Sequence, residues 1–194
     1  MPLNPMEEPI KFESLGELKS LKVTRNAGGF AGVILVELNR PKRLKAMDVA
    51  LFEEIPKIFN SLNCDVDARV VVLAGLGKGV CSGLDLGLLM QIGEKTKECE
   101  DPSRAGLFNL EFVKWLQNGI SAIEQCRLPV IAAAHGMCVG GGVDLFTATD
   151  IRICSEQTTF SVREVFFQQL SKRPLKRKYF FRPFKGMSRN KKEA

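Results

Sequence analysis

The chain of 194 residues is long enough for one sizeable domain, and its hydrophobic share of 45% is typical of a globular protein. No apolar run reaches the roughly 18 residues of a membrane-spanning helix, and the first residues carry neither a secretory nor an Arg-rich transit pattern. The net charge of +6 is not spread along the chain. Residues 171–194 hold ten Lys or Arg and one Glu, and the rest of the chain is slightly acidic.

The first third of the chain predicts a hairpin followed by a helix. Residues 21–26 alternate apolar and polar, and the β-branched run 32–41 ends at a proline, so the two predict paired antiparallel strands. Helical spacing of apolar residues predicts a helix over 47–63, with Asp48 as its N-cap. Pro56 should kink or break this helix.

The middle of the chain predicts a strand, a loop and two helices. The apolar run 68–75 is typical of a fully buried strand, and the glycine-rich segment 75–83 is expected to be a loop. A short helix follows over 85–93, and the polar segment 94–104 is expected to be a second loop. Residues 107–126 have the pattern of a long amphipathic helix.

The last part that carries a pattern alternates strands and a helix again. Residues 128–136 predict a buried strand, 140–150 a helix, and 151–155 and 158–162 two short strands. Strands that alternate with helices indicate the α/β class with mainly buried strands.

Six cysteines are scattered along the chain without a CxxC pair, and His135 is the only histidine. Zinc needs clustered donors, so we expect no metal site and free thiols in a reducing compartment. Catalysis by a Cys–His pair is not expected, and we interpret His135 as structural.

Three consecutive glycines, Gly140–Gly142, follow a predicted strand and precede Asp144. A helix start presents unpaired N–H groups, and glycine lets a ligand approach them. One such N–H group from this loop and one from 75–83 would hold a negative charge developing on oxygen. The spacing fits neither a phosphate loop nor a dinucleotide motif. Tight helix–strand packing for the glycines, and helix capping for Asp144, are equally good interpretations.

A second acid, Glu164, follows 20 residues after Asp144, beyond two predicted strands. Two acids that converge in one site suit proton transfer when their surroundings separate their pKa values. The spacing alone does not decide whether they converge.

Four segments together resemble the crotonase, or enoyl-CoA hydratase/isomerase, superfamily: VELNRPKRLKAMD (36–48), VCSGLDL (80–86), PVIAAAHGMCVGGGVDL (129–145) and ATDIRICSEQTTFSVREV (148–165). The resemblance is collinear from about residue 19 to 165. Within the superfamily the chain is most similar to the Δ3,5-Δ2,4-dienoyl-CoA isomerases, which have Asp and Glu where typical hydratases carry two Glu.

The resemblance implies a fold, a substrate and roles for residues. The fold would be a spiral of ββα units, and the substrate an acyl-CoA of fatty acid β-oxidation, with no cofactor beyond the CoA of the substrate. The backbone N–H groups of Leu84 and Gly141 would form an oxyanion hole, and Asp144 and Glu164 would be the catalytic acids that shift the double bonds. Contacts with substrate or CoA would come from Arg40, Lys45 (in place of a common family Asn), Ala46, Met47, Ser82, Gly83, Asp85 and Gly140.

After Val165 the resemblance ends, and Lys172 stands where the dienoyl isomerases have a further Asp. The family's C-terminal helices, which complete the acyl pocket and build trimers and hexamers, are not expected here. We therefore divide the chain into a flexible lead-in (1–18), a crotonase-like core (19–170) and a basic, disordered tail (171–194).

Two classes of function follow for such a chain. The first is an isomerase or an enoyl-CoA hydratase, weak or inactive in this form, and the second is a catalytically silent fragment that binds a protein or RNA through the tail. Aromatic residues among the basic ones would suit RNA or an anionic membrane surface, and a tail without a selected role is the favoured alternative. The family resides in mitochondria or peroxisomes, and with no targeting signal found the cytoplasm is the alternative.

Overall fold

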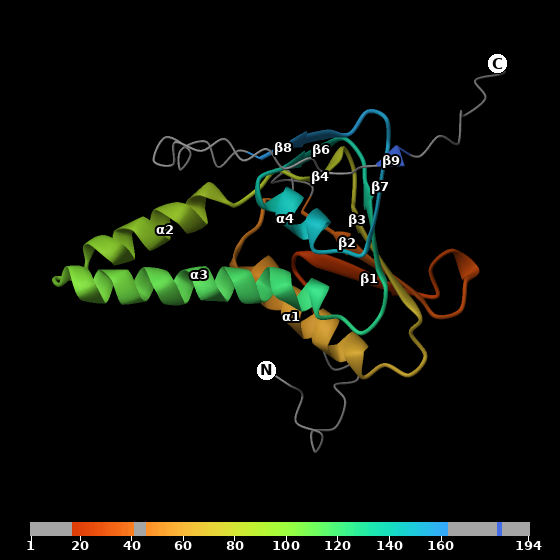
Figure 1. The fold of residues 1–194 in the computed structure, drawn as a ribbon, viewed down its shortest axis with the longest axis horizontal. Helices are drawn as coiled ribbons and strands as arrows, with labels where there is room; N and C mark the ends of the chain where they lie inside the picture. The colour runs from red at the N-terminus through yellow and green to blue at the C-terminus, as the bar shows by residue number, and fades with distance from the viewer. Residues whose placement is uncertain (1–16, 41–45, 163–181, 184–194) are drawn as a thin grey trace.

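The computed structural model describes residues 17–40, 46–162 and 182–183, which form an α/β fold with two sheets (Figure 1). The larger sheet has the strand order β1-β2-β3-β5-β7-β9, and the smaller has the order β4-β6-β8. Along the chain the elements are β1 Leu21–Arg25, the 3₁₀ turn η2 Ala27–Gly29, β2 Val33–Leu38, α1 Val49–Asn63, β3 Val70–Gly75, β4 Gly79–Cys81, α2 Leu86–Lys97, α3 Pro102–Glu124, β5 Val130–Ala134, β6 Met137–Val139, α4 Gly141–Thr147, β7 Ile151–Cys154, β8 Thr159–Ser161 and β9 Arg182–Pro183.

The predicted hairpin is confirmed, since β1 and β2 pair antiparallel with Val23 opposite Val36. The turn between them begins at Asn26, whose φ of 51° is left-handed. Asparagine tolerates this conformation, and its side-chain oxygen also accepts a hydrogen bond from the N–H of Gly32 at 3.0 Å. The turn residue therefore sets the register of the hairpin.

The chain then repeats one unit, in which a strand of the larger sheet is followed by a strand of the smaller sheet and by helix. β3 leads to β4 and α2, and β5 leads to β6 and α4, with all these strands parallel to their neighbours. This repetition confirms the α/β class and the predicted spiral of ββα units. The short strands β4 and β6 were not predicted, because 75–83 was expected to be a loop and no element was predicted for 137–139.

The helix α1 starts as predicted, with Asp48 accepting a hydrogen bond from the N–H of Leu51 at 3.0 Å. The prediction of a break at Pro56 is wrong, because α1 continues through it to Asn63. One apolar face of α1 holds the helix against the sheet on both sides of the proline, and burial of each such side chain contributes about 1.5–3 kcal/mol. This face consists of Leu51, Ile55, Ile58, Phe59 and Leu62, all at most 1% exposed.

The strand β3 is shorter and less enclosed than predicted. Its residues alternate between partly buried and buried, so only one face of the strand points into the core. The other face of β3 is on the side of the larger sheet that is opposite to α1, α3 and α4 (Figure 1). The apolar run was therefore misread as a strand covered on both faces.

The predicted polar loop 94–104 is largely helical. α2 extends to Lys97, and α3 begins already at Pro102, whose preceding residue Asp101 accepts a hydrogen bond from the N–H of Ser103 at 2.9 Å. Figure 1 shows α2 and α3 side by side, projecting from the body of the fold. The polar residues of α2 lie on this projecting arm. A helix there contacts few other elements, so few of its residues have to be apolar.

The core lies between the larger sheet and the helices α1 and α3. The two helices approach closely at Gly119, where an added Cβ would lie 2.7 Å from a ring carbon of Phe52. The ring of Phe52 also packs on Trp115, with centroids 5.2 Å apart. The small residue in α3 therefore fixes the distance at which α1 and α3 cross, and α3 forms a wall above the sheet.

The boundaries of the predicted lead-in and tail differ from the structure at a few residues. Leu18 packs against the core, although 1–18 was predicted as a flexible lead-in. Arg182–Pro183 form β9, which pairs with Ile153–Cys154 of β7, so the predicted separation of 171–194 from the core does not hold for these two residues. Of the other residues in these two segments, Glu17 is exposed, and residues 1–16, 171–181 and 184–194 lie outside the described part of the chain.

Candidate active site

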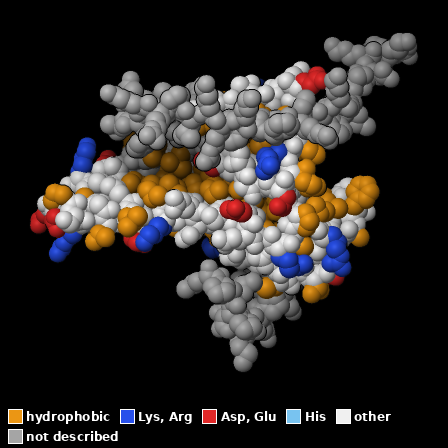
Figure 2. Space-filling model, in the orientation of Figure 1, with side chains coloured by type: hydrophobic (Ala, Val, Ile, Leu, Met, Phe, Trp, Pro, Cys, Tyr) orange, Lys and Arg blue, Asp and Glu red, His pale blue; other side chains and the backbone are white. Residues whose placement is uncertain are grey.

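A cavity of about 950 Å³ lies between the start of α1, the loop before α2, the helix α3 and the first turn of α4. Leu86 and Leu89 of α2, with Leu116 and Ile120 of α3, make much of its lining apolar. Figure 2 shows hydrophobic side chains gathered in a hollow over this region. A concave, largely apolar cavity with a few polar groups is the usual form of a small-molecule site.

The structure brings most of the predicted site residues to this cavity. The predicted residues that line it are Met47, Ser82, Gly83, Leu84, Gly140, Gly141 and Asp144. Three others are described but do not line it: Arg40, Ala46 and Asp85. Lys45 and Glu164 lie outside the described residues.

The N–H group of Leu84 is directed by the peptide bond that it shares with Gly83. The carbonyl of Gly83 accepts a hydrogen bond from the N–H of Met47 at 2.8 Å, and the N–H of Asp85 donates to the carbonyl of Met47 at 3.0 Å. In a trans peptide the C=O and N–H point in opposite directions. The N–H of Leu84 therefore points away from Met47, and it has no hydrogen-bond partner among the described residues.

The same reasoning applies to Gly141, the first residue of α4. The carbonyl of Gly140 accepts from the N–H of Val143 at 2.7 Å, so it points along the helix. The N–H of Gly141 consequently points out of the helix start, where it too has no partner within the described part of the chain. Two unpaired backbone donors thus belong to residues that line one cavity.

The three consecutive glycines have three different structural reasons. Gly140 has φ 52° and ψ −127°, a conformation that residues with a Cβ avoid. An added Cβ at Gly141 would lie 2.7 Å from the sulfur of Met47, and one at Gly142 would lie 2.6 Å from the Cβ of Cys81. A backbone conformation at Gly140 and close packing at Gly141 and Gly142 therefore account for the three glycines, in agreement with the packing interpretation, while access of a ligand to the N–H groups stays a prediction.

Asp144 lies in the first turn of α4 and is exposed to solvent at the cavity. Below it Cys138, in β6, is fully buried beside Cys81 of β4. Burial, then the neighbouring Cys81 and then the charge of Asp144 raise the pKa of the Cys138 thiol to about 12. The Cys138 thiol beneath α4 is therefore neutral at ordinary pH, and Asp144 is one of the acids that line the cavity, with Glu124 and Asp150.

We predict that a maleimide leaves Cys81 and Cys138 unmodified at pH 8 in the folded protein, while Cys64 and Cys99 react. The thiolate is the reactive form, and a pKa of about 12 leaves roughly one part in 10⁴ of Cys138 ionised at that pH. The cysteines that should react are partly exposed. Peptide mass spectrometry checks the result, and equal labelling of Cys138 and Cys99 would contradict the burial of the pair.

The same thiol has a consequence for stability at high pH. Its folded pKa lies above the ordinary 9.0, so the unfolded chain releases this proton first as the pH rises. The contribution of the neutral Cys138 is complete below pH 9 and is lost as the pH rises from there toward about 12.

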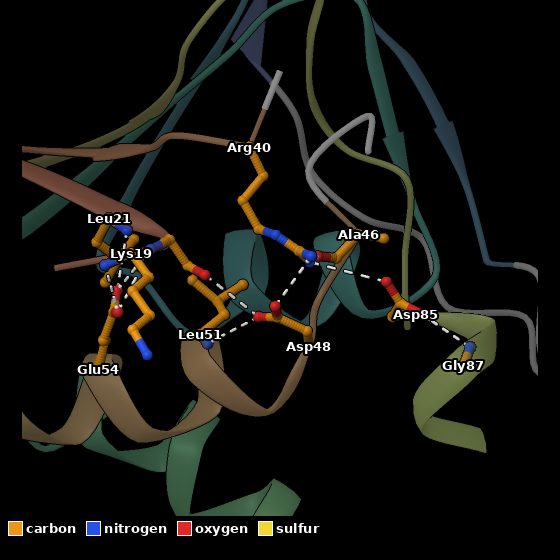
Figure 3. Close-up of polar contacts among 10 residues, drawn as sticks. Lys19, Leu21, Arg40, Ala46, Asp48, Leu51, Glu54, Asp85 and Gly87 are labelled. Atoms are coloured by element: carbon orange, nitrogen blue, oxygen red, sulfur yellow. Dashed lines mark hydrogen bonds and ion pairs between the residues drawn. The ribbon is translucent and has the colours of Figure 1, made fainter. Parts of the chain in front are cut away.

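Arg40 and Asp85, predicted as contacts of a substrate, are instead occupied with each other and with neighbouring groups (Figure 3). The guanidinium of Arg40 contacts the carboxylate of Asp48 at 2.9 Å and that of Asp85 at 3.8 Å, and donates to the carbonyl of Ala46. The other oxygen of Asp85 accepts from the N–H of Gly87 at 2.8 Å and caps α2.

Several lining residues were missed by the sequence reasoning. Phe52 of α1 and a row on α3, namely Leu116, Gln117, Ile120 and Glu124, contribute to the cavity. The helical spacing on α3 was recognised, but the spacing does not tell which face meets the sheet and which meets the site. The only signal in the sequence is the spacing on this helix. Leu116 and Ile120 are apolar and four residues apart, and polar Gln117 and Glu124 lie on the same side of the helix.

His135 is placed as its predicted structural role requires. Its Nε2 atom lies 2.5 Å from the carbonyl oxygen of Gly77, and the residue does not line the cavity. Among the described residues no three His, Cys, Asp or Glu side chains lie together as metal ligands would. In that same part of the chain, no helix has the length and apolar character to cross a membrane.

Comparison with known proteins gives consistent findings. A family model for enoyl-CoA hydratase/isomerase matches residues 28–168. The chain is 44% identical over 147 residues to the peroxisomal Δ3,5-Δ2,4-dienoyl-CoA isomerase of Arabidopsis thaliana, covering 76% of this chain and 52% of that protein. It is 40% identical over 164 residues to the human mitochondrial Δ3,5-Δ2,4-dienoyl-CoA isomerase, covering 82% and 49%. The chain thus spans about half the length of the curated relatives it matches.

Solved structures agree with these findings. The fold matches a putative enoyl-CoA hydratase from Streptomyces coelicolor A3(2) with a TM-score of 0.62 and 29% identity, over 82% of this chain and 52% of the other. It also matches an enoyl-CoA hydratase from Bacillus anthracis with a TM-score of 0.61 and 27% identity, over 76% and 52%.

Proposed function

Because the chain belongs to the enoyl-CoA hydratase/isomerase family, we propose that it shifts the double bonds of a 3,5-dienoyl-CoA to the 2,4 positions. One observation supports this most directly. Leu84 and Gly141, whose backbone N–H groups have no partner among the described residues, line one cavity together with Asp144. A pair of donors beside an acid suits a reaction in which negative charge develops on a carbonyl oxygen while a proton moves.

In the proposed reaction the thioester carbonyl oxygen accepts hydrogen bonds from Leu84 and Gly141. These bonds lower the energy of the dienolate that forms when a proton leaves C2 of the substrate. A proton returned to C6 completes the shift, so atoms and charge balance without an oxidant or reductant. We propose Asp144 as one proton carrier and Glu164 as the other.

The apolar part of the cavity, with Leu89, Leu116 and Ile120, is proposed to hold the acyl chain away from water. Exclusion of water strengthens the two N–H contacts, because the local dielectric falls. The thioester end would lie against Met47, Ser82, Gly83 and Gly140, which line the cavity next to the donors. For the remaining predicted CoA contacts, Ala46 and Lys45 stay proposals.

The relatives also guide a proposal for compartment and cofactor. Those with dienoyl isomerase names are mitochondrial or peroxisomal, and we propose the same compartments for this protein. Moving a proton from C2 to C6 transfers no net electrons, so we propose that the substrate's own CoA is the only carrier group involved.

Hydration of a 2-enoyl-CoA is a second candidate, since solved structures that share the fold include proteins named enoyl-CoA hydratases. The same pair of N–H groups would polarise the carbonyl in that reaction. The shorter side chain of Asp144, where typical hydratases have Glu, favours the isomerase.

The test compares both reactions on the purified full chain. A 3,5-dienoyl-CoA should gain the absorbance of a conjugated 2,4-dienoyl thioester, and a 2-enoyl-CoA should lose its enoyl absorbance more slowly. A melting curve with a dienoyl-CoA gives a readout independent of turnover, because a ligand that binds the folded state raises the midpoint.

Each outcome decides between the candidates. Faster loss of the 2-enoyl-CoA would make the protein a hydratase. Absence of both reactions and of any shift in the midpoint would support the alternative of a catalytically silent chain that binds another partner, and would overturn the proposal.

A further inference from the structure

We propose that Arg40 is a positioning residue of the oxyanion hole, which aims the N–H of Leu84 without touching the substrate. The expected effect of Arg40 on kcat rests on the proposed function. The claim that Arg40 fixes the direction of the Leu84 N–H rests on the contacts alone. Nothing in the family resemblance gives this role to Arg40, which the sequence had suggested as a contact for CoA.

The charges around Arg40 argue against a contact with the phosphates of CoA. Its side chain is 17% exposed and lies between two carboxylates, those of Asp48 and Asp85, which are 28% and 16% exposed. Among the described residues, the one positive charge of Arg40 thus faces two negative ones. Because the guanidinium already pairs with both carboxylates, it has less capacity to bind an anionic phosphate.

The contacts of Arg40 join the starts of two helices (Figure 3). Asp48 caps α1, and Asp85 caps α2. The guanidinium also donates to the carbonyl of Ala46, the residue before Met47. Arg40 therefore binds the 46–48 segment on one side and the residue after Leu84 on the other.

The contacts around Leu84 together fix the orientation of the Gly83–Leu84 peptide. Met47 donates to the carbonyl of Gly83 and accepts from the N–H of Asp85, so its backbone holds the residues on both sides of Leu84. The side chain of Asp85 is held by Arg40 and by the N–H of Gly87. Rotation of the Gly83–Leu84 peptide would break the hydrogen bond between the carbonyl of Gly83 and the N–H of Met47. Arg40 holds Met47 in place through its contact with the neighbouring Ala46.

Removal of the guanidinium should release this arrangement. Asp48 and Asp85 would then face each other as uncompensated, partly buried acids, and their repulsion would separate the two helix starts. Misplacement of a catalytic group by about 1 Å costs about 10²-fold in rate, and loss of an oxyanion donor costs about 10²–10³-fold. We expect Arg40→Met to lower kcat by about 10–100-fold.

The experiment compares Arg40→Met, Arg40→Lys and the double variant Arg40→Met/Asp85→Asn with the wild type. Arg25→Met is the matched control, because Arg25 also pairs with an aspartate, Asp65, and does not line the cavity. The readouts are kcat and KM for a 3,5-dienoyl-CoA, the absorption of bound 2,4-dienoyl-CoA, and amide hydrogen exchange of the peptide that covers 80–90 in the free protein. The dienoyl absorption moves to longer wavelength when hydrogen bonds polarise its carbonyl.

Arg40→Met should lower kcat more than it changes KM, should reduce the spectral shift of the bound dienoyl-CoA, and should speed exchange in the 80–90 peptide. Arg40→Lys should recover part of each effect, because it restores the charge without the planar fork of donors. Removing the charge of Asp85 in the double variant should recover part of kcat, since one of the repelling acids is gone. Arg25→Met should resemble the wild type.

Three results would overturn the inference. A raised KM with unchanged kcat would indicate a direct contact with CoA. An unchanged spectral shift in Arg40→Met would show that the donors had not moved. If the wild type itself shows neither turnover nor a spectral shift, the proposed function fails, and unchanged exchange at 80–90 in Arg40→Met would then independently refute the positioning role.

Discussion

Replacing Asp144 with asparagine should lower kcat for the 3,5-dienoyl-CoA by about 10²–10⁴-fold, the usual cost of losing a positioned proton carrier. The amide has nearly the same shape and fits the exposed place that Asp144 occupies in the first turn of α4. The helix therefore keeps its start, and the two N–H donors keep their directions. Stopped-flow or steady-state measurement of the conjugated-diene absorbance gives kcat and KM.

The matched control is Glu124→Gln, which changes another carboxylate of the same cavity, on α3 instead of α4. We expect this variant to lose far less activity than Asp144→Asn, because Glu124 has no part in the proposed proton transfer and loss of a positioned proton carrier is what costs about 10²–10⁴-fold. Both variants should melt at the temperature of the wild type. Equal losses in the two variants would mean that the cavity needs negative charge in general and that Asp144 has no special role.

The largest effect on stability is expected for Gly136→Ala, at the corner between β5 and β6. Gly136 has φ 59°, and an added Cβ would overlap the carbonyl oxygen of Lys78, which belongs to the backbone and cannot turn away. A left-handed conformation costs a residue with a Cβ about 1–2 kcal/mol, and overpacking adds about 1–3 kcal/mol. We expect the free energy of unfolding to fall by about 2–5 kcal/mol.

Urea unfolding followed by tryptophan fluorescence measures this loss, since the single Trp115 lies on α3 beside the core. Gly93→Ala, within α2, is the control, because nothing lies within 4 Å of the Cβ that it adds. Alanine in a helix interior should raise stability by about 0.5–1 kcal/mol relative to glycine. A stable Gly136→Ala protein would show that the corner can relax, and the tight approach of the two sheets would lose its explanation.

The elements that the sequence predicted well are those whose pattern is local. The hairpin β1–β2 and the helix α1 have a clear period and a turn or a cap, at Asn26 and Asp48. β4 and β6, with three residues each, have no measurable period and form only by pairing with strands far along the chain. The extension of α2 was missed because polarity was read as loop, although Glu and Lys are good helix formers.

The candidate site also has features that could be predicted from the sequence and features that could not. Residue types and the family resemblance led to Asp144 and to the glycine turns, which the structure brings to one cavity. The direction of an N–H group has no signature in residue type, because every residue except proline has one. The contacts of Arg40 have no local signature either. The family resemblance implies a contact with CoA, and the partners that the structure shows for Arg40, namely Asp48 and Asp85, are two helix caps far apart in the chain.

The contact between Met47 and Gly141 constrains how this protein can evolve. The thioether occupies the volume that a side chain at 141 would need, so the two positions share one space although 94 residues separate them in the chain. A lineage that substitutes alanine at 141 must therefore move the Met47 thioether or replace it. The side chain tolerated at one position thus depends on the side chain present at the other, and changes at the two sites should be coupled.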